Sequence, residues 1–308
     1  MRILVLGAGA VGGYFGGRLA EAGRDVTFLV RPPRAAALAE RGLSVVSPLG
    51  DFRVSVKVTI ADRLEGPYDL IILATKHYDL GGAISAIRPA VGPQTAILPL
   101  LNGLVQLDRL DVTLGSAKVL GGVAYVGASL TPDGSIRHHN RLSGIAFGER
   151  GGGRSDRARA IAAEFSGTPV SAPGEDNVLL DMWEKFVMIT AMAGMNCLMR
   201  GNIGEIAATE DGADLMGEFF AECGEVATVA GFAPRSEYLD RIVPMLTEKG
   251  SINSASMRTD LDAGQRTEAD AILGDMLNRA RCLGVTTPLL RAARCHMQVY
   301  ENRLATRV

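Results

Sequence analysis

The first twelve residues restrict the fold more than any other part of the chain. An apolar run, residues 3–6, leads directly into a Gly-x-Gly-x-x-Gly spacing. In such a motif the first glycine allows a tight turn, the second lets the backbone approach a pyrophosphate, and the third lets a helix pack on the strand. A helix-forming stretch, residues 14–22, follows and would present its N-terminal N–H groups to phosphate. We therefore expect a dinucleotide to bind a loop of six residues: Gly7, Ala8, Gly9, Ala10, Val11 and Gly12.

The two parts of the sequence differ in hydrophobic periodicity. In the first part, strand-like runs alternate with helical patterns at 13–22, 33–41 and 79–88, and the strand-like runs lie at 2–6, 26–30, 69–74, 95–99 and 118–126. This alternation predicts a parallel sheet with helices on both faces. Shorter alternating runs at 43–47, 52–58, 135–139 and 143–148 indicate added strands or hairpins.

Beyond a Pro-Gly-containing linker at 173–176, helical periodicity dominates to the end of the chain. The predicted fold class is α/β. A Rossmann-type dinucleotide-binding domain spans residues 1–172, and an all-helical substrate domain spans residues 173–308.

Composition excludes several classes of function. The net charge of −2 gives no general attraction to nucleic acid or to a membrane surface. The longest mostly apolar stretch, residues 186–199, is too short to span a bilayer, and no cationic and apolar leader precedes the first strand. The four cysteines form no metal-binding pattern and are expected to be reduced thiols. We expect a cytoplasmic protein without a metal ion, a nucleic-acid partner or a membrane partner.

The end of the second predicted strand indicates which dinucleotide binds. An acidic residue there favours NAD by bonding the ribose 2′-hydroxyl, whereas an arginine accommodates the 2′-phosphate of NADP. Arg31 lies nineteen positions after Gly12, and no Asp or Glu occurs between Val26 and Ala39. We expect NADPH or NADP as the cofactor, with Lys76, after the third strand, adding positive charge. The alternative is that both are solvated surface cations.

Three features beyond the cofactor motif are candidates for the chemistry. Asn102, in an Asn-Gly pair, follows a strand end that faces the cofactor crevice, although Asn-Gly commonly marks only a turn. Lys185 precedes an apolar helical run, where burial would lower its pKa and suit it to proton donation. Ser256 and Glu268 follow in the last quarter. Each candidate has a purely structural alternative. Lys185 would be a surface lysine, Ser254 would cap its own helix, and Glu268 would be a first-turn acid after a capping box of Thr267 and Asp270.

Together these features resemble the ketopantoate reductase family of NADPH-dependent 2-dehydropantoate 2-reductases, over nearly the whole chain. The twelve-residue separation of Ser256 and Glu268 is the most specific match. The resemblance implies that Lys185 protonates the substrate carbonyl and that Glu268 supports it and positions substrate. It also implies that Ser256 and Asn102 bind substrate, and that Asn102 lies near the nicotinamide. Arg31 and Lys76 would contact cofactor phosphate.

The chain departs from the family pattern at two substrate-binding positions and, more mildly, at Leu101, where glutamine is common before Asn-Gly. The family carries substrate-binding asparagines four and eight positions after the lysine, where this sequence has Ile189 and Ala193. Losing hydrogen bonds to a substrate hydroxyl changes specificity by orders of magnitude. The expected reaction is reduction of 2-dehydropantoate to (R)-pantoate, in pantothenate and coenzyme A biosynthesis. The alternative is reduction of a different, less polar 2-oxo acid.

Two further hypotheses about the function remain open. Fold does not fix function, so a non-catalytic NADP(H)-binding sensor is possible. An NAD-linked 3-hydroxy acid dehydrogenase would share the two-domain plan, although Arg31 argues against NAD. The only partners that we expect are a small 2-oxo acid and a second copy of the chain in a homodimer.

Overall fold

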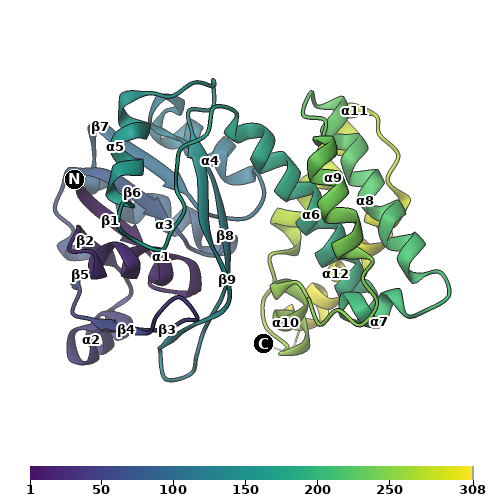
Figure 1. The fold of residues 1–308 in the computed structure, drawn as a ribbon, viewed down its shortest axis with the longest axis horizontal. Coiled ribbons are helices and arrows are strands. Elements are labelled where there is room, and N and C mark those ends of the chain that lie inside the picture. Colours follow the sequence, from purple (N-terminus) through teal and green to yellow (C-terminus); the bar gives the residue numbers. More distant parts are fainter. Residues whose placement is uncertain (307–308) are drawn as a thin grey trace. The chain divides into compact units, whose positions relative to one another are not determined.

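The computed structural model describes residues 1–306, which form two compact units (Figure 1). The N-terminal unit contains Met1–Leu101 and Gln106–Val178. The helical unit contains Asn102–Val105 and the described residues from Leu179 onward. The short segment Asn102–Val105 therefore packs with helices that lie far from it in the sequence.

A parallel five-stranded sheet is the centre of the N-terminal unit. Its strand order is β5-β2-β1-β6-β7, formed by Lys57–Thr59, Asp25–Leu29, Arg2–Leu6, Tyr68–Leu73 and Val91–Pro99. The central strand β1 is an apolar run whose Ile3, Leu4 and Val5 are fully buried. Leu6 pairs in register with Leu29 of β2 and with Leu73 of β6. The loops that follow these three strands consequently share one edge of the sheet.

Helices connect these strands at the expected places. α1 (Ala10–Glu21), α2 (Pro32–Arg41) and α3 (Leu80–Ile87) match the predicted helices. Gly16 of α1 lies against Phe28 of β2, since a methyl group there would stand 2.7 Å from Cζ of the ring. α1 thus packs closely on the sheet because glycine faces an aromatic ring.

The prediction that residues 118–126 form a strand of the parallel sheet was wrong for residues 121–126. They contribute to β8 (Gly121–Leu130), which pairs antiparallel with β9 (Ile136–Gly148) in a second sheet of order β4-β3-β9-β8. β3 is Leu43–Val46 and β4 is Phe52–Val54. The turn between β8 and β9 is closed by a hydrogen bond from the N–H of Thr131 to the carbonyl oxygen of Ser135. This local hairpin pairs the backbone of β8 with β9, whereas Val119, just before β8, forms an isolated parallel bridge with Ile97 of β7.

Two more helices complete this region, α4 (Val105–Leu114) and α5 (Asp156–Glu164). The segment predicted as a linker remains tied to the N-terminal unit, because the N–H of Glu175 donates to the carbonyl oxygen of Phe147 at 2.7 Å. The domain boundary at residue 172 stays a prediction.

The helical unit contains no strand among its described residues. Its helices are α6 (Val178–Met199), α7 (Ile203–Ala207), α8 (Gly212–Val229), α9 (Ser236–Leu246), α10 (Ser256–Asp262), α11 (Asp275–Leu283) and α12 (Pro288–Ala305), with a π-helical turn at Asp270–Gly274. α6 is the central helix, and its Gly194 lets α8 approach, because a methyl group there would stand 2.5 Å from Cζ of Phe219. An α/β unit followed by an all-helical region confirms the predicted fold class.

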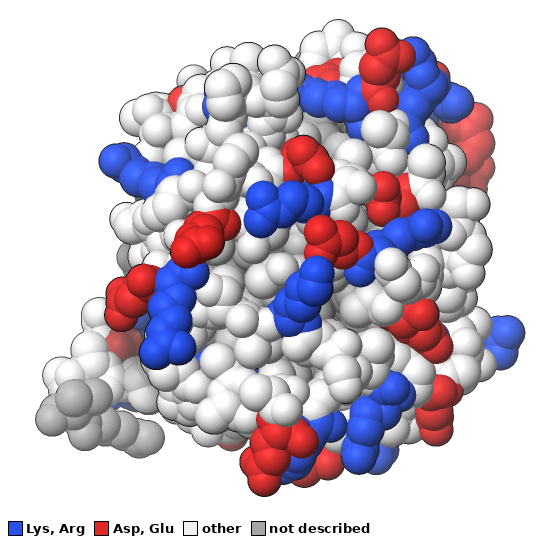
Figure 2. Space-filling view, turned by 90° about the vertical axis from the view of Figure 1, so that its left-hand side faces the viewer, with Lys and Arg blue, Asp and Glu red and all other residues white. Residues whose placement is uncertain are grey.

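Charges of both signs are mixed on one face of the molecule. On the face in Figure 2, Lys and Arg lie interspersed with Asp and Glu, without a patch of one sign. Within residues 1–306, no helix has the length and apolar character needed to cross a membrane. The same residues contain no cluster of three or more potential metal ligands.

Candidate functional site

The glycine loop after β1 has the geometry that its sequence predicts. Gly7 adopts a φ of +98°, a backbone conformation that favours glycine, and its N–H donates to the carbonyl oxygen of Leu29. A methyl group at Gly12 would stand 2.1 Å from the carbonyl oxygen of Gly7 and 2.9 Å from Cβ of Ala74. By contrast, no atom of the described chain lies within 4 Å of a methyl group at Gly9. The loop is therefore closely packed on its inner side and open where a pyrophosphate would approach.

Polar groups beside the loop fit a bound dinucleotide. The side-chain oxygen of Thr75, which follows β6, is buried and has no hydrogen-bond partner among residues 1–306. The Arg34 guanidinium donates to the carbonyl oxygens of Ala8 at 3.0 Å and Gly134 at 2.9 Å. Burial lowers the pKa of this Arg34 guanidinium. Arg34 holds the glycine loop in place, and the Thr75 hydroxyl is available for a ligand.

Arg31 forms an ion pair with Asp79, an acid that was not predicted from the sequence. It directly precedes α2, its side chain is 78% exposed, and its Nη2 lies 2.8 Å from Oδ2 of Asp79. Lys76 directly follows the loop after β6 and precedes a 3₁₀ turn at His77–Asp79. The dinucleotide-binding pattern places such an acid at the end of β2, whereas Asp79 follows β6. The sequence signal by which Asp79 can be found is its position three residues after Lys76.

Lys185 lies on a turn of α6 that hydrogen bonds to α9 and to the residue before it hold in place. Burial lowers the pKa of its ammonium group to about 8. The neighbouring Glu184 is 2% exposed and accepts hydrogen bonds from the backbone N–H and the guanidinium of Arg235. The Tyr238 hydroxyl donates to the carbonyl oxygen of Glu184 at 2.9 Å. These contacts fix the turn of α6 that carries Lys185.

The Asn102–Gly103 loop connects three predicted parts of the site. Gly103 has a φ of +85°, and a methyl group on it would stand 3.5 Å from Cε2 of Phe186 and 3.2 Å from the carbonyl oxygen of Ala271. Phe186 directly follows Lys185, and Ala271 lies three residues after Glu268. The structure therefore brings together the segments that carry Asn102, Lys185 and Glu268 within the helical unit.

The predicted capping box before Glu268 does not form. The side-chain oxygen of Thr267 accepts from the N–H of Ala269, but Asp270 binds Arg294 of α12 at 2.9 Å. Because Arg294 engages Asp270, this carboxylate does not close a capping box, and the chain enters a π-helical turn at Asp270–Gly274. Glu268 itself is 9% exposed. Such π-helical turns occur frequently at functional sites.

Ser256 belongs to α10, which contacts a different part of α6 from the turn that carries Lys185. It is the exposed first residue of α10, and the N–H of the preceding Ala255 donates to Oδ1 of Asn196 at 2.9 Å. Asn196 is eleven residues after Lys185, which is about 16 Å along a helix. The alternative that Ser254 caps this helix was wrong, because the N-cap residue is Ala255 and no side chain caps the helix. The substrate-binding role of Ser256 stays a prediction.

The face of α6 around Lys185 is apolar. Helical spacing places Met188, Ile189 and Met192 on the same face as Lys185, and all four side chains are partly exposed. Ala193 is 2% exposed. Sequence reasoning singled out Ile189 and Ala193, whereas the structure adds Met188 and Met192 to the accessible surface.

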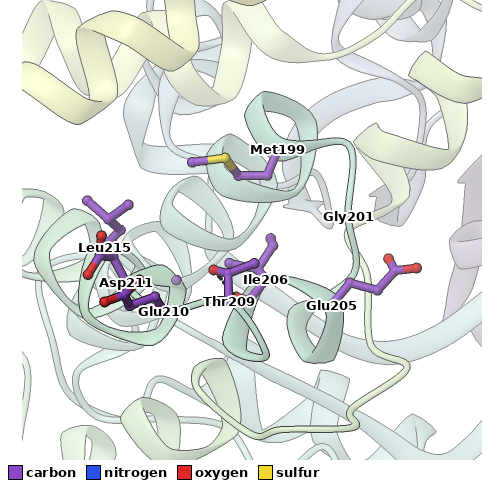
Figure 3. A pocket seen from close by; sticks show the side chains of 9 residues that line it. Met199, Gly201, Glu205, Ile206, Thr209, Glu210, Asp211 and Leu215 are labelled. Carbon is purple, nitrogen blue, oxygen red and sulfur yellow. Dashed lines mark hydrogen bonds between the residues drawn. The ribbon is translucent and has the colours of Figure 1, made fainter.

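A separate hollow of about 410 Å³ lies beside the end of α6 (Figure 3). It is lined by Met199, Gly201, Glu205, Ile206, Thr209, Glu210, Asp211, Gly212 and Leu215. None of the residues predicted for the site lines it. Glu205 already closes a capping box with Asn202 at the start of α7. The hollow therefore contributes nothing to the candidate site.

The chain is similar to known proteins in both sequence and structure. Residues 3–152 match the family model "Ketopantoate reductase PanE/ApbA", and residues 177–299 match its C-terminal counterpart. The oxidoreductase YkpB of Bacillus subtilis is 33% identical over 98% of this chain and 99% of its own length. The crystal structure of 2-dehydropantoate 2-reductase from Methylococcus capsulatus has a TM-score of 0.87 at 26% identity, covering 99% of this chain and 98% of that one.

A second solved structure has the same fold. It is a ternary complex of D-mandelate dehydrogenase with NADH and anilino(oxo)acetate, with a TM-score of 0.87 at 22% identity and 99% coverage of both chains.

Proposed function

Because this chain belongs to the ketopantoate reductase PanE/ApbA family, we propose that it reduces the carbonyl group of a 2-oxo acid with NADPH. The leading substrate is 2-dehydropantoate and the product (R)-pantoate, which would place the chain in pantothenate biosynthesis. The observation that carries the proposal is the contact of Gly103 with Phe186 and Ala271, which gathers the segments of Asn102, Lys185 and Glu268. A sensor that only binds a dinucleotide has no need for this arrangement.

The roles of these residues follow from their chemistry. The bound nicotinamide cofactor supplies a hydride to the carbonyl carbon. The ammonium group of Lys185 stabilises the negative charge that develops on the carbonyl oxygen and then donates its proton to that oxygen. With a pKa of about 8, Lys185 remains largely protonated at neutral pH and gives up its proton readily. Glu268 supports Lys185 and positions the substrate, and Asn102 and Ser256 donate hydrogen bonds to it.

The cofactor is held by residues of the N-terminal unit and by Asn102. The loop of residues 7–12 would hold the pyrophosphate, where Gly9 leaves space and Thr75 offers an unpartnered hydroxyl among the described residues. Arg31 and Lys76 would bind the phosphates of NADPH. These roles rest on the loop geometry and on the chemistry of the donors.

A less polar 2-oxo acid is the second candidate substrate. Met188, Ile189 and Met192 share the accessible face of α6 with Lys185, so this face offers apolar contact instead of amide hydrogen bonds. A site without a hydrogen-bond partner discriminates poorly in favour of a hydroxylated substrate. Measurement of kcat/KM on a panel of 2-oxo acids, with NADPH, separates the two candidates.

The variant Ile189→Asn sharpens that measurement. An amide at this partly exposed position restores the hydrogen-bonding group that the family pattern predicts. The kcat/KM for 2-dehydropantoate should therefore rise relative to that for phenylglyoxylate, a 2-oxo acid without a hydroxyl group. Val243→Asn, an exposed position on α9, is the matched control. If the wild-type chain binds NADPH but reduces no 2-oxo acid, the proposed reaction is wrong and the sensor function replaces it.

We also propose that the chain acts in the cytoplasm as a homodimer. Sedimentation equilibrium of the purified chain measures its oligomeric state, and a monomer at micromolar concentration would contradict this part of the proposal.

A further inference from the structure

The ion pair between Arg31 and Asp79 joins two loops on opposite sides of β1. β1 pairs with β2 on one side and with β6 on the other, and its last residue, Leu6, is in register with the last residues of both. Arg31 lies two residues beyond the end of β2, and Asp79 lies six residues beyond the end of β6. The pair therefore extends across the end of β1, where the glycine loop begins.

The two members of this pair favour different dinucleotides. A guanidinium at this edge of the sheet binds the 2′-phosphate of an NADP-type cofactor, whereas a carboxylate accepts a hydrogen bond from the 2′-hydroxyl of an NAD-type cofactor. In dinucleotide-binding folds the acid normally follows the second strand, where this chain has Arg31. Asp79 supplies the missing carboxylate from the β6 side, with Oδ2 at 2.8 Å from the Arg31 guanidinium.

The exposure of the pair makes it easy to rearrange. The Arg31 side chain is 78% exposed and that of Asp79 is 40% exposed, so both remain hydrated when they separate. Exposed ion pairs contribute little net stability, and a doubly charged phosphate competes well for the same guanidinium. When Arg31 binds a phosphate, the nearby Asp79 carboxylate repels that phosphate.

We propose that Asp79 is a specificity-determining residue that weakens the preference for NADPH and allows the chain to bind NADH as well. This inference rests on the proposed use of a nicotinamide cofactor, and it adds a determinant that acts against Arg31. The Asp79 carboxylate repels the 2′-phosphate of NADPH and accepts a hydrogen bond from the 2′-hydroxyl of NADH. NADPH and NADH therefore bind with comparable affinity.

The test measures cofactor binding without any 2-oxo acid. Dissociation constants of NADPH, NADH and adenosine 2′,5′-bisphosphate are determined by calorimetry for the wild type and for Asp79→Asn. The ratio of the NADH to the NADPH dissociation constant should rise about threefold to fivefold in the variant, the range expected for one exposed charge. Affinity for adenosine 2′,5′-bisphosphate should rise by a similar factor, because this probe carries the 2′-phosphate without nicotinamide.

Asp156→Asn is the matched control. Asp156 also forms an exposed ion pair with an arginine of the same unit, Arg159, and it lies in α5, away from the glycine loop in the sequence. Its loss should leave all three dissociation constants unchanged. In an Arg31→Ala background, Asp79→Asn should still remove repulsion, but the affinity for the 2′-phosphate starts far lower.

A clear result would overturn the inference. If Asp79→Asn changes the dissociation constants of NADPH and NADH by the same factor, or changes neither, Asp79 does not determine specificity. A wild-type preference for NADPH above a hundredfold would also exclude it. Since no substrate is present, failure of the proposed 2-oxo acid reduction leaves this binding test valid, and failure of this test leaves the reduction untouched.

Discussion

Gly103 lies against the aromatic ring of Phe186, since a methyl group built on Gly103 would stand 3.5 Å from Cε2 of that ring. This relationship places the loop after β7 beside the turn of α6 that carries Lys185. A left-handed glycine is needed there, because its φ is +85°. The contact explains why Asn102–Val105 belongs to the helical unit although the sequence on both sides of it belongs to the N-terminal unit.

Removal of the Lys185 ammonium group should abolish most of the turnover. For Lys185→Ala we expect kcat to fall by about 10²- to 10⁴-fold, the range typical of a lost general acid. The dissociation constant of NADPH should change less than about twofold, because the loop of residues 7–12 is intact. Steady-state kinetics and calorimetry measure the two quantities. The exposed Lys249 provides the control variant, Lys249→Ala. Unchanged kcat in Lys185→Ala would remove the lysine from the mechanism.

The pH dependence of the reduction should report the titration of Lys185. Burial lowers the pKa of this group to about 8, and the acid is competent only in its protonated form. The rate constant kcat/KM should therefore be constant below this value and fall about tenfold per pH unit above it. A profile that stays level up to pH 10 would show that another group donates the proton.

Two glycine substitutions should separate cofactor binding from folding. A methyl group at Gly9 meets open space, so Gly9→Ala should keep its melting temperature but weaken NADPH binding by about tenfold through overpacking of the pyrophosphate. In Gly12→Ala the methyl group would stand 2.1 Å from a backbone oxygen, so the melting temperature should fall as well. Thermal unfolding and NADPH titration distinguish the variants.

Gly224 of α8 gives the control for both, because a methyl group there meets no described atom within 4 Å. Gly224→Ala should leave NADPH affinity unchanged. Equal losses of NADPH affinity in Gly9→Ala and Gly224→Ala would contradict the assignment of the loop.

Loss of Arg235 should destabilise the chain. Glu184 is 2% exposed, and its carboxylate is held by Arg235, which also binds Asp181. Removing the cation leaves two carboxylates without their charge partner, and we expect Arg235→Ala to cost about 2–3 kcal/mol, less than a fully buried pair because Arg235 is half-exposed. Urea unfolding measures the loss. Arg159→Ala removes a surface ion pair instead and should cost less than about 0.5 kcal/mol.

Several parts of the fold followed from local sequence signals. The apolar β1, the glycine loop and α1 were predicted because strand, turn and helix preferences all act within about twenty residues. The switch to helices beyond the linker at 173–176 was also predicted, since periodicity is a local property, and the structure begins α6 at Val178. The placement of β8 in a second sheet was missed, because an apolar run carries no record of which strand it pairs with.

By itself, the sequence determined the strand–glycine loop–helix unit at the start, the change to an all-helical region, and the family to which the chain belongs. These features depend on residue types at fixed short spacings. Only the tertiary structure decided that Asp79 faces Arg31, that Met188 and Met192 share the accessible face of α6, and that the Gly103 loop joins Lys185 to the segment of Glu268. Contacts between residues that are tens to hundreds of positions apart arise when strands align and helices pack, and no local preference specifies them.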